Sequence, residues 1–170
     1  MKRPQPTQLQ YLTGDATQPV GGGHKLIIHV CNDVGAWGRG FTTSLNYRWP
    51  VVEMAFRAWH LGSTDLERLK AFMTGSFKLG AVQFVDVNDA ITIANMVAQH
   101  GLGRANEPIR YDALRECLGH VEEYCWDGKQ TIHAPKFGAG LAGGDWDRIR
   151  KITEVALCER GIPVAIYERA

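Results

Sequence analysis

Two glycine-rich segments carry the residue types and spacing that could do chemistry. The first, at 35–41, reads Gly-Ala-Trp-Gly-Arg-Gly-Phe, and the second, at 137–144, has glycines at 138, 140, 143 and 144. Glycine has no side chain, so backbone N–H groups in such segments can turn toward an anion. A helix that begins directly after such a loop adds the positive end of its dipole. A single glycine pattern is typical of an ordinary tight turn, but two of them, each between a strand and a helix, favour a site that grips a diphosphate.

Several other kinds of site are not indicated. Neither segment has the G-x-x-x-x-G-K-[ST] pattern of a P-loop. The four cysteines are widely spaced and include no C-x-x-C pair, so we expect neither a zinc nor a redox site, and no metal or cofactor. Lys and Arg total 19 against 18 Asp and Glu, which gives no basic surface for sequence-blind binding of nucleic acid or membrane. The chain shows no apolar run long enough to span a membrane and no signal-peptide segment at its start, so we expect a cytoplasmic protein.

The elements that would position the two loops alternate along the chain. We expect strands at 9–13, 25–30, 82–87, 91–97, 131–134 and 164–167. We expect helices at 42–49, 50–60, 111–125 and 146–160, with one or two helical turns at 66–72. Asp145 is the expected N-cap of the last helix. This alternation predicts one α/β domain over 1–170, a mixed central sheet sandwiched between helices. Ligands of such sheets bind beyond the carboxyl ends of the strands, where both glycine loops would lie.

Five segments, in the same order along the chain, resemble the macrodomain family. They are YLTGDAT at 11–17, HVCNDVGAWGRGF at 29–41, YDAL at 111–114, APKFGAGLAGGDW at 134–146 and IY at 166–167. The two glycine segments are similar to the phosphate loops of the branch that includes an ADP-ribose-1″-phosphate phosphatase. They are also similar to those of hydrolases that strip ADP-ribose from protein carboxylates or DNA bases. The resemblance implies a macrodomain that binds ADP-ribose or a derivative, with ADP-ribosylated protein or nucleic acid as a further partner.

The resemblance also implies ligand contacts at the matched positions. Asp15 would accept a hydrogen bond from the adenine amino group beside the backbone of Ala16, and Tyr167 is a candidate for the adenine wall. Asn32 would lie beside the distal ribose. The backbone of both loops would hold the diphosphate, through Gly38, Arg39, Gly40, Phe41, Gly138, Ala139, Gly140 and Leu141. Asp15 and Asn32 could instead be turn residues that bond to their own backbone.

The catalytic groups are less well defined by the resemblance. The hydrolases carry a lysine just after the strand that matches 91–97, and some carry an aspartate in the second loop, where this chain has Gln99 and Ala142. The ionisable groups nearest the expected distal ribose are His29, Asp33 and His100, which we take as candidates for general acid–base catalysis. His29 could equally be a core histidine, and Asp33 an exposed loop carboxylate. We therefore expect a hydrolase of ADP-ribose derivatives. The alternatives are a non-catalytic ADP-ribose reader and a binder of another nucleoside diphosphate.

Overall fold

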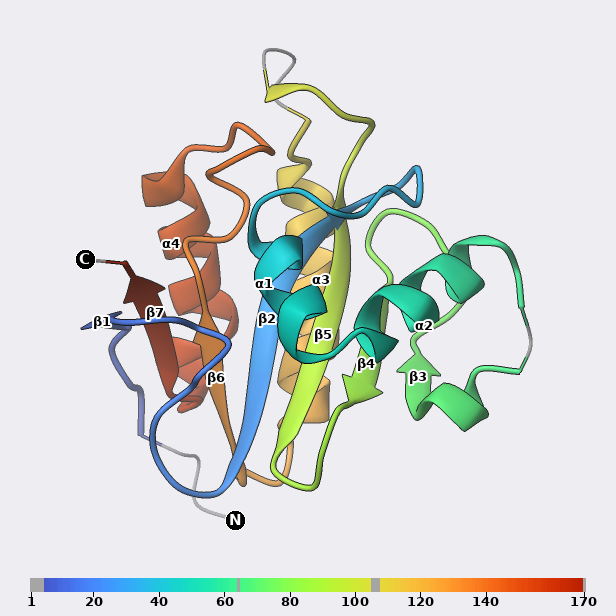
Figure 1. Cartoon of the computed structure of the whole chain (residues 1–170). Helices are drawn as coiled ribbons and strands as arrows, with labels where there is room; N and C mark the ends of the chain where they lie inside the picture. The colour runs from blue at the N-terminus through green and yellow to red at the C-terminus, as the bar shows by residue number, and fades with distance from the viewer. Residues whose placement is uncertain (1–4, 64, 105–107, 170) are drawn as a thin grey trace.

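A mixed sheet of seven strands forms the centre of the computed structural model, which describes residues 5–63, 65–104 and 108–169 (Figure 1). The spatial order is β1-β7-β6-β2-β5-β4-β3. The strands are β1 (Gln10–Thr13), β2 (His24–Asn32), β3 (Ala71–Met73), β4 (Val82–Asp86), β5 (Ile91–Gln99), β6 (Gln130–Ala134) and β7 (Val164–Glu168). In this spatial order, neighbouring strands from β1 to β5 are parallel. β4 pairs antiparallel with both β5 and β3. The predicted mixed sheet is confirmed.

Helices cover both faces of this sheet. α1 (Phe41–Arg48) and α2 (Val51–His60) lie on one face, and α3 (Tyr111–Tyr124) and α4 (Trp146–Ala156) on the other (Figure 1). Side chains along β2 alternate between the two cores, so that Leu26 and Ile28 pack with α3 and α4 while Ile27 packs with α1 and α2. This explains why the sequence of β2 is apolar at consecutive positions, because a parallel strand inside a covered sheet is buried on both sides.

The parallel order brings the ends of three strands together. β6, β2 and β5 are neighbours and run in the same direction. Their carboxyl ends therefore lie at one edge of the sheet, the upper edge in Figure 1, and the three loops that leave them start side by side. Both glycine-rich segments belong to this group of loops, as the sequence predicts.

Two predicted elements are wrong in part. The segment 66–72 forms one 3-10 turn, Glu67–Leu69, and then a strand, β3. Lys70 has a left-handed backbone, φ 55°, which ends the turn, and β3 then pairs with β4. The helix expected at 146–160 stops at Ala156, and a separate 3-10 turn follows at Cys158–Arg160. Its N-cap is confirmed, since the Asp145 carboxylate accepts a hydrogen bond from the Asp147 N–H.

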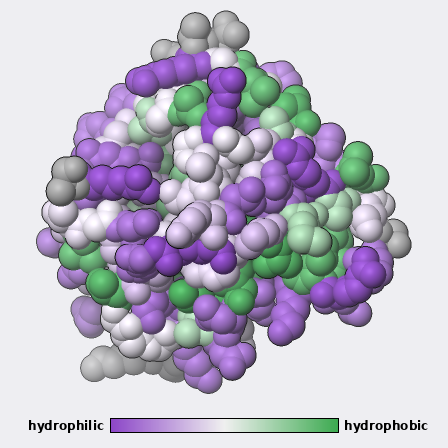
Figure 2. Space-filling view, viewed as in Figure 1, coloured by the Kyte–Doolittle hydropathy of each residue, from purple (hydrophilic) through white to green (hydrophobic). Residues whose placement is uncertain are grey.

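The surface on the side shown in Figure 1 is largely hydrophilic, with an apolar area on the side where α2 and β3 lie (Figure 2). Met54 of α2 and Phe72 of β3 are among the exposed apolar side chains of the molecule. None of the helices in the described part of the chain has the length and apolar character that a membrane span requires.

A candidate ligand cleft between two glycine loops

A cleft of about 720 Å³ opens beyond the carboxyl ends of β2, β5 and β6. Its walls are the two glycine-rich loops and a third segment, 102–104, that follows β5. A volume of this size accommodates a small molecule such as a nucleotide. The charged side chains among the described lining residues are Arg39, Arg104 and Lys136, and none of those lining residues is a carboxylate. The electrostatic environment therefore favours an anionic ligand.

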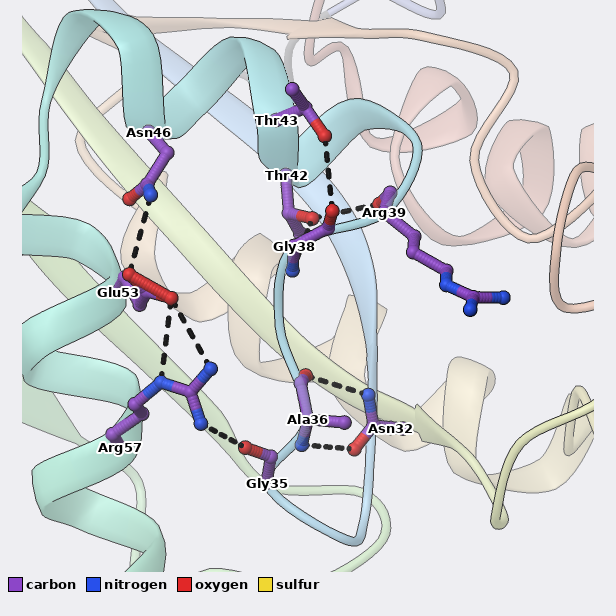
Figure 3. Close-up of polar contacts among 10 residues, drawn as sticks. All are labelled: Asn32, Gly35, Ala36, Gly38, Arg39, Thr42, Thr43, Asn46, Glu53 and Arg57. Carbon is purple, nitrogen blue, oxygen red and sulfur yellow. Dashed lines mark hydrogen bonds and ion pairs between the residues drawn. The ribbon is translucent and has the colours of Figure 1, made fainter.

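Asn32 shapes the first glycine loop. Its Oδ1 accepts hydrogen bonds from the N–H groups of Val34 and Ala36, at 3.1 and 2.9 Å. Its Nδ2 donates to the Ala36 carbonyl at 2.8 Å (Figure 3). Asn32 lines the cleft, as expected for a residue beside a ligand, but its amide is already bonded to the loop. In the structure Asn32 is therefore a turn residue that bonds to its own backbone, which was one of the two roles considered from the sequence.

Helix α2 holds the first loop from behind. The Gly35 backbone packs so closely on the His60 ring that a Cβ at Gly35 would lie 2.3 Å from His60 Nδ1. Arg57 donates to the Gly35 carbonyl at 3.4 Å (Figure 3). The Trp37 ring packs against Phe56, with ring centroids 5.2 Å apart, so this tryptophan anchors the loop to α2 while it lines the cleft.

The end of the first loop presents the amino terminus of α1 to the cleft. Gly40 has φ +66° and is the N-cap residue, and Phe41 begins the helix. The first amides of a helix have no carbonyl partner within it and carry the positive end of the helix dipole. Thr42 supports the turn before the helix, since its Oγ1 accepts from Gly38 N–H at 3.1 Å and donates to the Arg39 carbonyl at 2.7 Å (Figure 3).

The second glycine loop is tightly folded on one side and open on the other. The Gly144 N–H bonds to the Gly138 carbonyl at 2.8 Å, and a Cβ at Gly144 would lie 2.5 Å from that oxygen. Gly140, in contrast, lines the cleft, and a Cβ there would meet nothing within 4 Å. Ala139 packs against the core and is not among the lining residues. Leu141 reaches across to the first loop, where a Cβ at Gly40 would lie 3.3 Å from Leu141 Cδ1.

Asp15 follows the end of β1 by two residues and lies outside the residues that line the cleft. Its Oδ1 accepts hydrogen bonds from both the N–H and the hydroxyl of Thr17, each at 2.8 Å. Partial burial alone would raise the pKa of Asp15, but these hydrogen bonds and the nearby Arg169 and Arg48 lower it below its ordinary value. Asp15 is therefore an ionised turn residue.

An aromatic contact links the Asp15 turn to the cleft. Ala16 and Tyr167 form a buried cluster against which Phe41 packs, and Phe41 lines the cleft. The Tyr167 side chain is 6% exposed, and its hydroxyl contacts His133 Nδ1 at 2.8 Å and accepts from the Val20 N–H at 3.0 Å. Tyr167 thus packs against Ala16 of the Asp15 turn and bonds to the segment that follows it.

The three catalytic candidates are not brought together. His29 is 2% exposed, lines the cleft, and its Nε2 lies 2.5 Å from Asn95 Oδ1. Burial lowers the pKa of His29 to about 4, although the Asn95 contact opposes this shift. Asp33 and His100 lie outside the lining residues and pair with each other, Oδ2 to Nδ1, at 2.7 Å.

Asp33 holds the start of the segment that forms the third wall of the cleft, 102–104. Besides contacting His100, its carboxylate accepts from the Gly101 N–H at 2.8 Å. Partial burial would raise the pKa of Asp33, but the hydrogen bonds from Gly101 and His100 and the nearby imidazole lower it. Gln99 lines the cleft and donates to the Gly101 carbonyl at 2.9 Å. These contacts hold the segment that carries Arg104.

Sequence reasoning missed this third wall. Leu102, Gly103 and Arg104 line the cleft because β5 lies beside β2 in the sheet. A signal existed in the glycines at 101 and 103, which directly follow an apolar strand and have φ +67° and +98°. Lys136 was also overlooked as a lining residue. It contacts Glu168 at 2.7 Å, and this ion pair joins the ends of β6 and β7.

Comparisons with known proteins give this cleft a family context. No protein-family model matches the chain. A solved structure of a macrodomain protein from Streptomyces coelicolor is 41% identical, with a TM-score of 0.79, and the match covers 96% of this chain and 100% of that one. Thermosipho africanus DarTG in complex with ADP-ribose superposes with a TM-score of 0.67 at 19% identity, over 99% of this chain and 43% of that one.

Curated proteins also match in sequence, among them the following two. An ADP-ribose 1″-phosphate phosphatase from Candida albicans is 24% identical over 160 residues, 89% of this chain and 92% of the phosphatase. Mouse chromodomain-helicase-DNA-binding protein 1-like is 28% identical over 173 residues, which are 95% of this chain and 18% of the mouse protein. The chain thus spans less than a fifth of that relative. Because the Streptomyces protein is matched over its full length at 41% identity, the chain belongs to the macrodomain family.

Proposed function

We propose that the cleft binds ADP-ribose with its diphosphate between the two glycine loops. The observation that carries this proposal is the arrangement of the loops, in which the amino terminus of α1 faces Gly138 and Gly140 across a cation-lined cleft. Backbone N–H groups at a helix start bind phosphate oxygens, and arginine guanidinium groups pair with them in a bidentate way. The ADP-ribose in the DarTG complex and the name of the Candida phosphatase support this ligand over other nucleoside diphosphates.

In this proposal the adenine lies beside the Asp15 turn, next to the cleft wall at Phe41. Both Thr17 contacts are to Asp15 Oδ1, so we assign Oδ2 as the acceptor of the adenine amino group. Asp15→Ala then removes that acceptor and weakens ADP-ribose binding by about 1–3 kcal/mol, measured by titration calorimetry. Asp127→Ala is the matched control, because Asp127 also bonds to a backbone N–H two residues on, in a turn after α3. Equal losses in the two variants contradict the assignment.

We further propose that the protein hydrolyses a group linked at the 1″ position of ADP-ribose. His29 is the candidate base, because it is the histidine among the described lining residues and is neutral near pH 7. Asp33 and His100 then act through the segment 101–104 that they hold. With Gln99 at the position of the relatives' lysine, no covalent lysyl intermediate forms there.

A specific observation favours a second candidate, a non-catalytic reader of ADP-ribosylated partners. Gln99 and Ala142 both line the cleft at the positions where hydrolases of the resembling branch carry lysine and aspartate. Neither side chain transfers a proton at neutral pH. A reader needs the cleft alone, and the attached protein or nucleic acid is its partner.

Incubation with three substrates separates these functions. ADP-ribose-1″-phosphate, mono-ADP-ribosylated protein and mono-ADP-ribosylated DNA are each assayed for release of phosphate or free ADP-ribose. For a hydrolase, His29→Ala lowers turnover by about 10²–10⁴-fold, which is more than the loss of one hydrogen bond, about tenfold, takes from ADP-ribose affinity. Full activity in His29→Ala, Asp33→Ala and His100→Ala contradicts the catalytic assignment. A wild-type protein that binds ADP-ribose and releases nothing is a reader, and one that does not bind ADP-ribose refutes the proposed function.

A further inference from the structure

A buried chain of side-chain hydrogen bonds runs from the cleft to helix α2. His29 on β2 contacts Asn95 on β5, whose Nδ2 donates to Gln83 Oε1 on β4 at 3.0 Å. Gln83 Nε2 then donates to the Ala55 carbonyl of α2 at 2.9 Å. Asn95 and Gln83 are fully buried, so every link is shielded from water. Burying a polar group without a hydrogen-bond partner destabilises the folded protein, so buried polar side chains are almost always hydrogen-bonded.

The direction of every hydrogen bond in this chain is determined at its far end. The Ala55 carbonyl can only accept, so the amide group that faces it must be the NH₂ of Gln83. The second neighbour of that nitrogen, Met73 Sδ at 3.6 Å, is also an acceptor. Gln83 therefore turns its oxygen to Asn95 and receives a hydrogen from Asn95 Nδ2. Asn95 in turn presents Oδ1 to His29.

This polarity decides the tautomer of His29. Because Asn95 Oδ1 can only accept, His29 Nε2 must carry the proton, and Nδ1 of the neutral ring keeps a lone pair. Burial keeps the ring neutral, with its pKa lowered to about 4. Among the described residues, the ring has aromatic contacts with Trp37 and Phe41 and polar contacts with Asn95 and Cys31. None of these four is charged at neutral pH, since burial raises the pKa of the Cys31 thiol well above its ordinary value.

The neighbouring thiol does not occupy this lone pair in line. Cys31 Sγ lies 3.9 Å from Nδ1 and 3.7 Å from Nε2. A sulfur on the axis of the Nδ1 lone pair would be much farther from Nε2 than from Nδ1. The nearly equal distances place it beside the ring instead. With Nε2 committed to Asn95, Nδ1 is the nitrogen through which His29 can bond to a ligand.

We propose that Asn95 and Gln83 are positioning residues that hold His29 with an unprotonated Nδ1, which accepts a hydrogen bond from a hydroxyl group of the bound ligand. The inference rests on the proposed function, because it takes the cleft to be the ligand site. A ribose hydroxyl can donate to Nδ1, whereas an ionised phosphate has only acceptors and would leave Nδ1 without a donor. In this proposal the unprotonated Nδ1 of His29 thus favours a ligand hydroxyl over a phosphate oxygen at this position of the cleft.

Long-range proton–nitrogen correlation spectra of ¹⁵N-histidine protein test the tautomer without any ligand. We expect the His29 pattern of a protonated Nε2, unchanged from pH 6 to pH 8. Saturation with ADP-ribose should then shift the Nδ1 resonance alone, as expected for a lone pair that accepts a hydrogen bond. A protonated Nδ1 in the free protein overturns the proposal. So does an Nδ1 resonance that stays in place at saturation. Failure of ADP-ribose to saturate the protein counts against the proposed function and leaves the test of the tautomer valid.

A substitution in the chain tests the positioning role. Asn95→Asp keeps the shape but places a carboxylate at His29 Nε2, so the pKa of His29 rises and the ring protonates at both nitrogens near pH 6. Nδ1 then becomes a donor, and the affinity for ADP-ribose at pH 6 falls about tenfold relative to pH 8 and to the wild-type protein. Asn88→Asp, in the turn between β4 and β5, adds the same charge away from the cleft and should change neither reading.

Gln83→Met covers the outcome in which Asn95→Asp does not fold. It keeps a side chain of similar length and frees the Asn95 amide to rotate, so that both neutral tautomers of His29 should appear in the spectrum. A His29 pattern identical to the wild type in a folded Gln83→Met protein overturns the positioning role.

Discussion

At the scale of single residues, Gly140 offers the cleanest test of the cleft. Its backbone is not left-handed and a Cβ there would meet nothing within 4 Å, so valine can be accommodated without strain. Gly140→Val fills the space beside the backbone that we propose binds the diphosphate, and we expect ADP-ribose binding to be lost with an unchanged circular dichroism spectrum. Gly22→Val is the control, because Gly22 is equally open and lies in the turn before β2. Gly40 is unsuitable, because its φ of +66° would strain any branched side chain.

At the scale of elements, the start of α4 shows how a cap holds the second loop. The Asp145 carboxylate accepts from the Asp147 N–H at 3.0 Å, and the Asp145 N–H donates to the Tyr111 hydroxyl of α3 at 2.9 Å. Asp145→Ala removes the cap, and we expect chemical denaturation to show a free energy of unfolding lower by about 1 kcal/mol. Asp65→Ala, in an exposed pair with Arg68, should cost less than about 0.5 kcal/mol. Equal losses would mean that the cap contributes nothing of its own.

At the scale of the whole molecule, two buried histidines tie stability to pH. Burial lowers the pKa of both His29 and His133 to about 4, and the nearby Lys25 adds to the shift of His133. In the unfolded chain a histidine titrates near 6.5, so below that pH the unfolded state binds more protons. Their contribution to stability is therefore complete above about pH 6.5 and is lost as the pH falls from 6.5 toward 4. We expect each to cost on the order of 2–3 kcal/mol by pH 4.

Thermal unfolding measured between pH 7.5 and 4 checks this expectation. His133→Gln keeps a polar group beside the Tyr167 hydroxyl and removes the titration, so its melting temperature should fall less steeply with pH than that of the wild type. Parallel curves for the two proteins would contradict the assignment to His133.

The sequence alone determined the alternation of strands and helices, the two glycine loops and the cap at Asp145, because all of these depend on neighbours a few residues away. The segment 66–72 shows where that reasoning fails, because helical turns were expected there. The strand β3 begins at its end because β4 lies beside it, a contact that no local propensity encodes.

The candidate site divides in the same way. The glycine loops were recognisable because the turn chemistry is local, and the resemblance named Asp15 and Asn32. Only the tertiary structure showed that the Asn32 amide hydrogen-bonds to its own loop. It alone also showed that Asp33 pairs with His100 outside the cleft, and that Arg104 lines a third wall. The tautomer of His29 likewise depends on residues 54 and 66 positions away along the chain, Gln83 and Asn95, because strand order brings β2, β5 and β4 together. Contacts between strands that are distant in sequence are set by packing of the whole sheet, which is why the sequence could not show them.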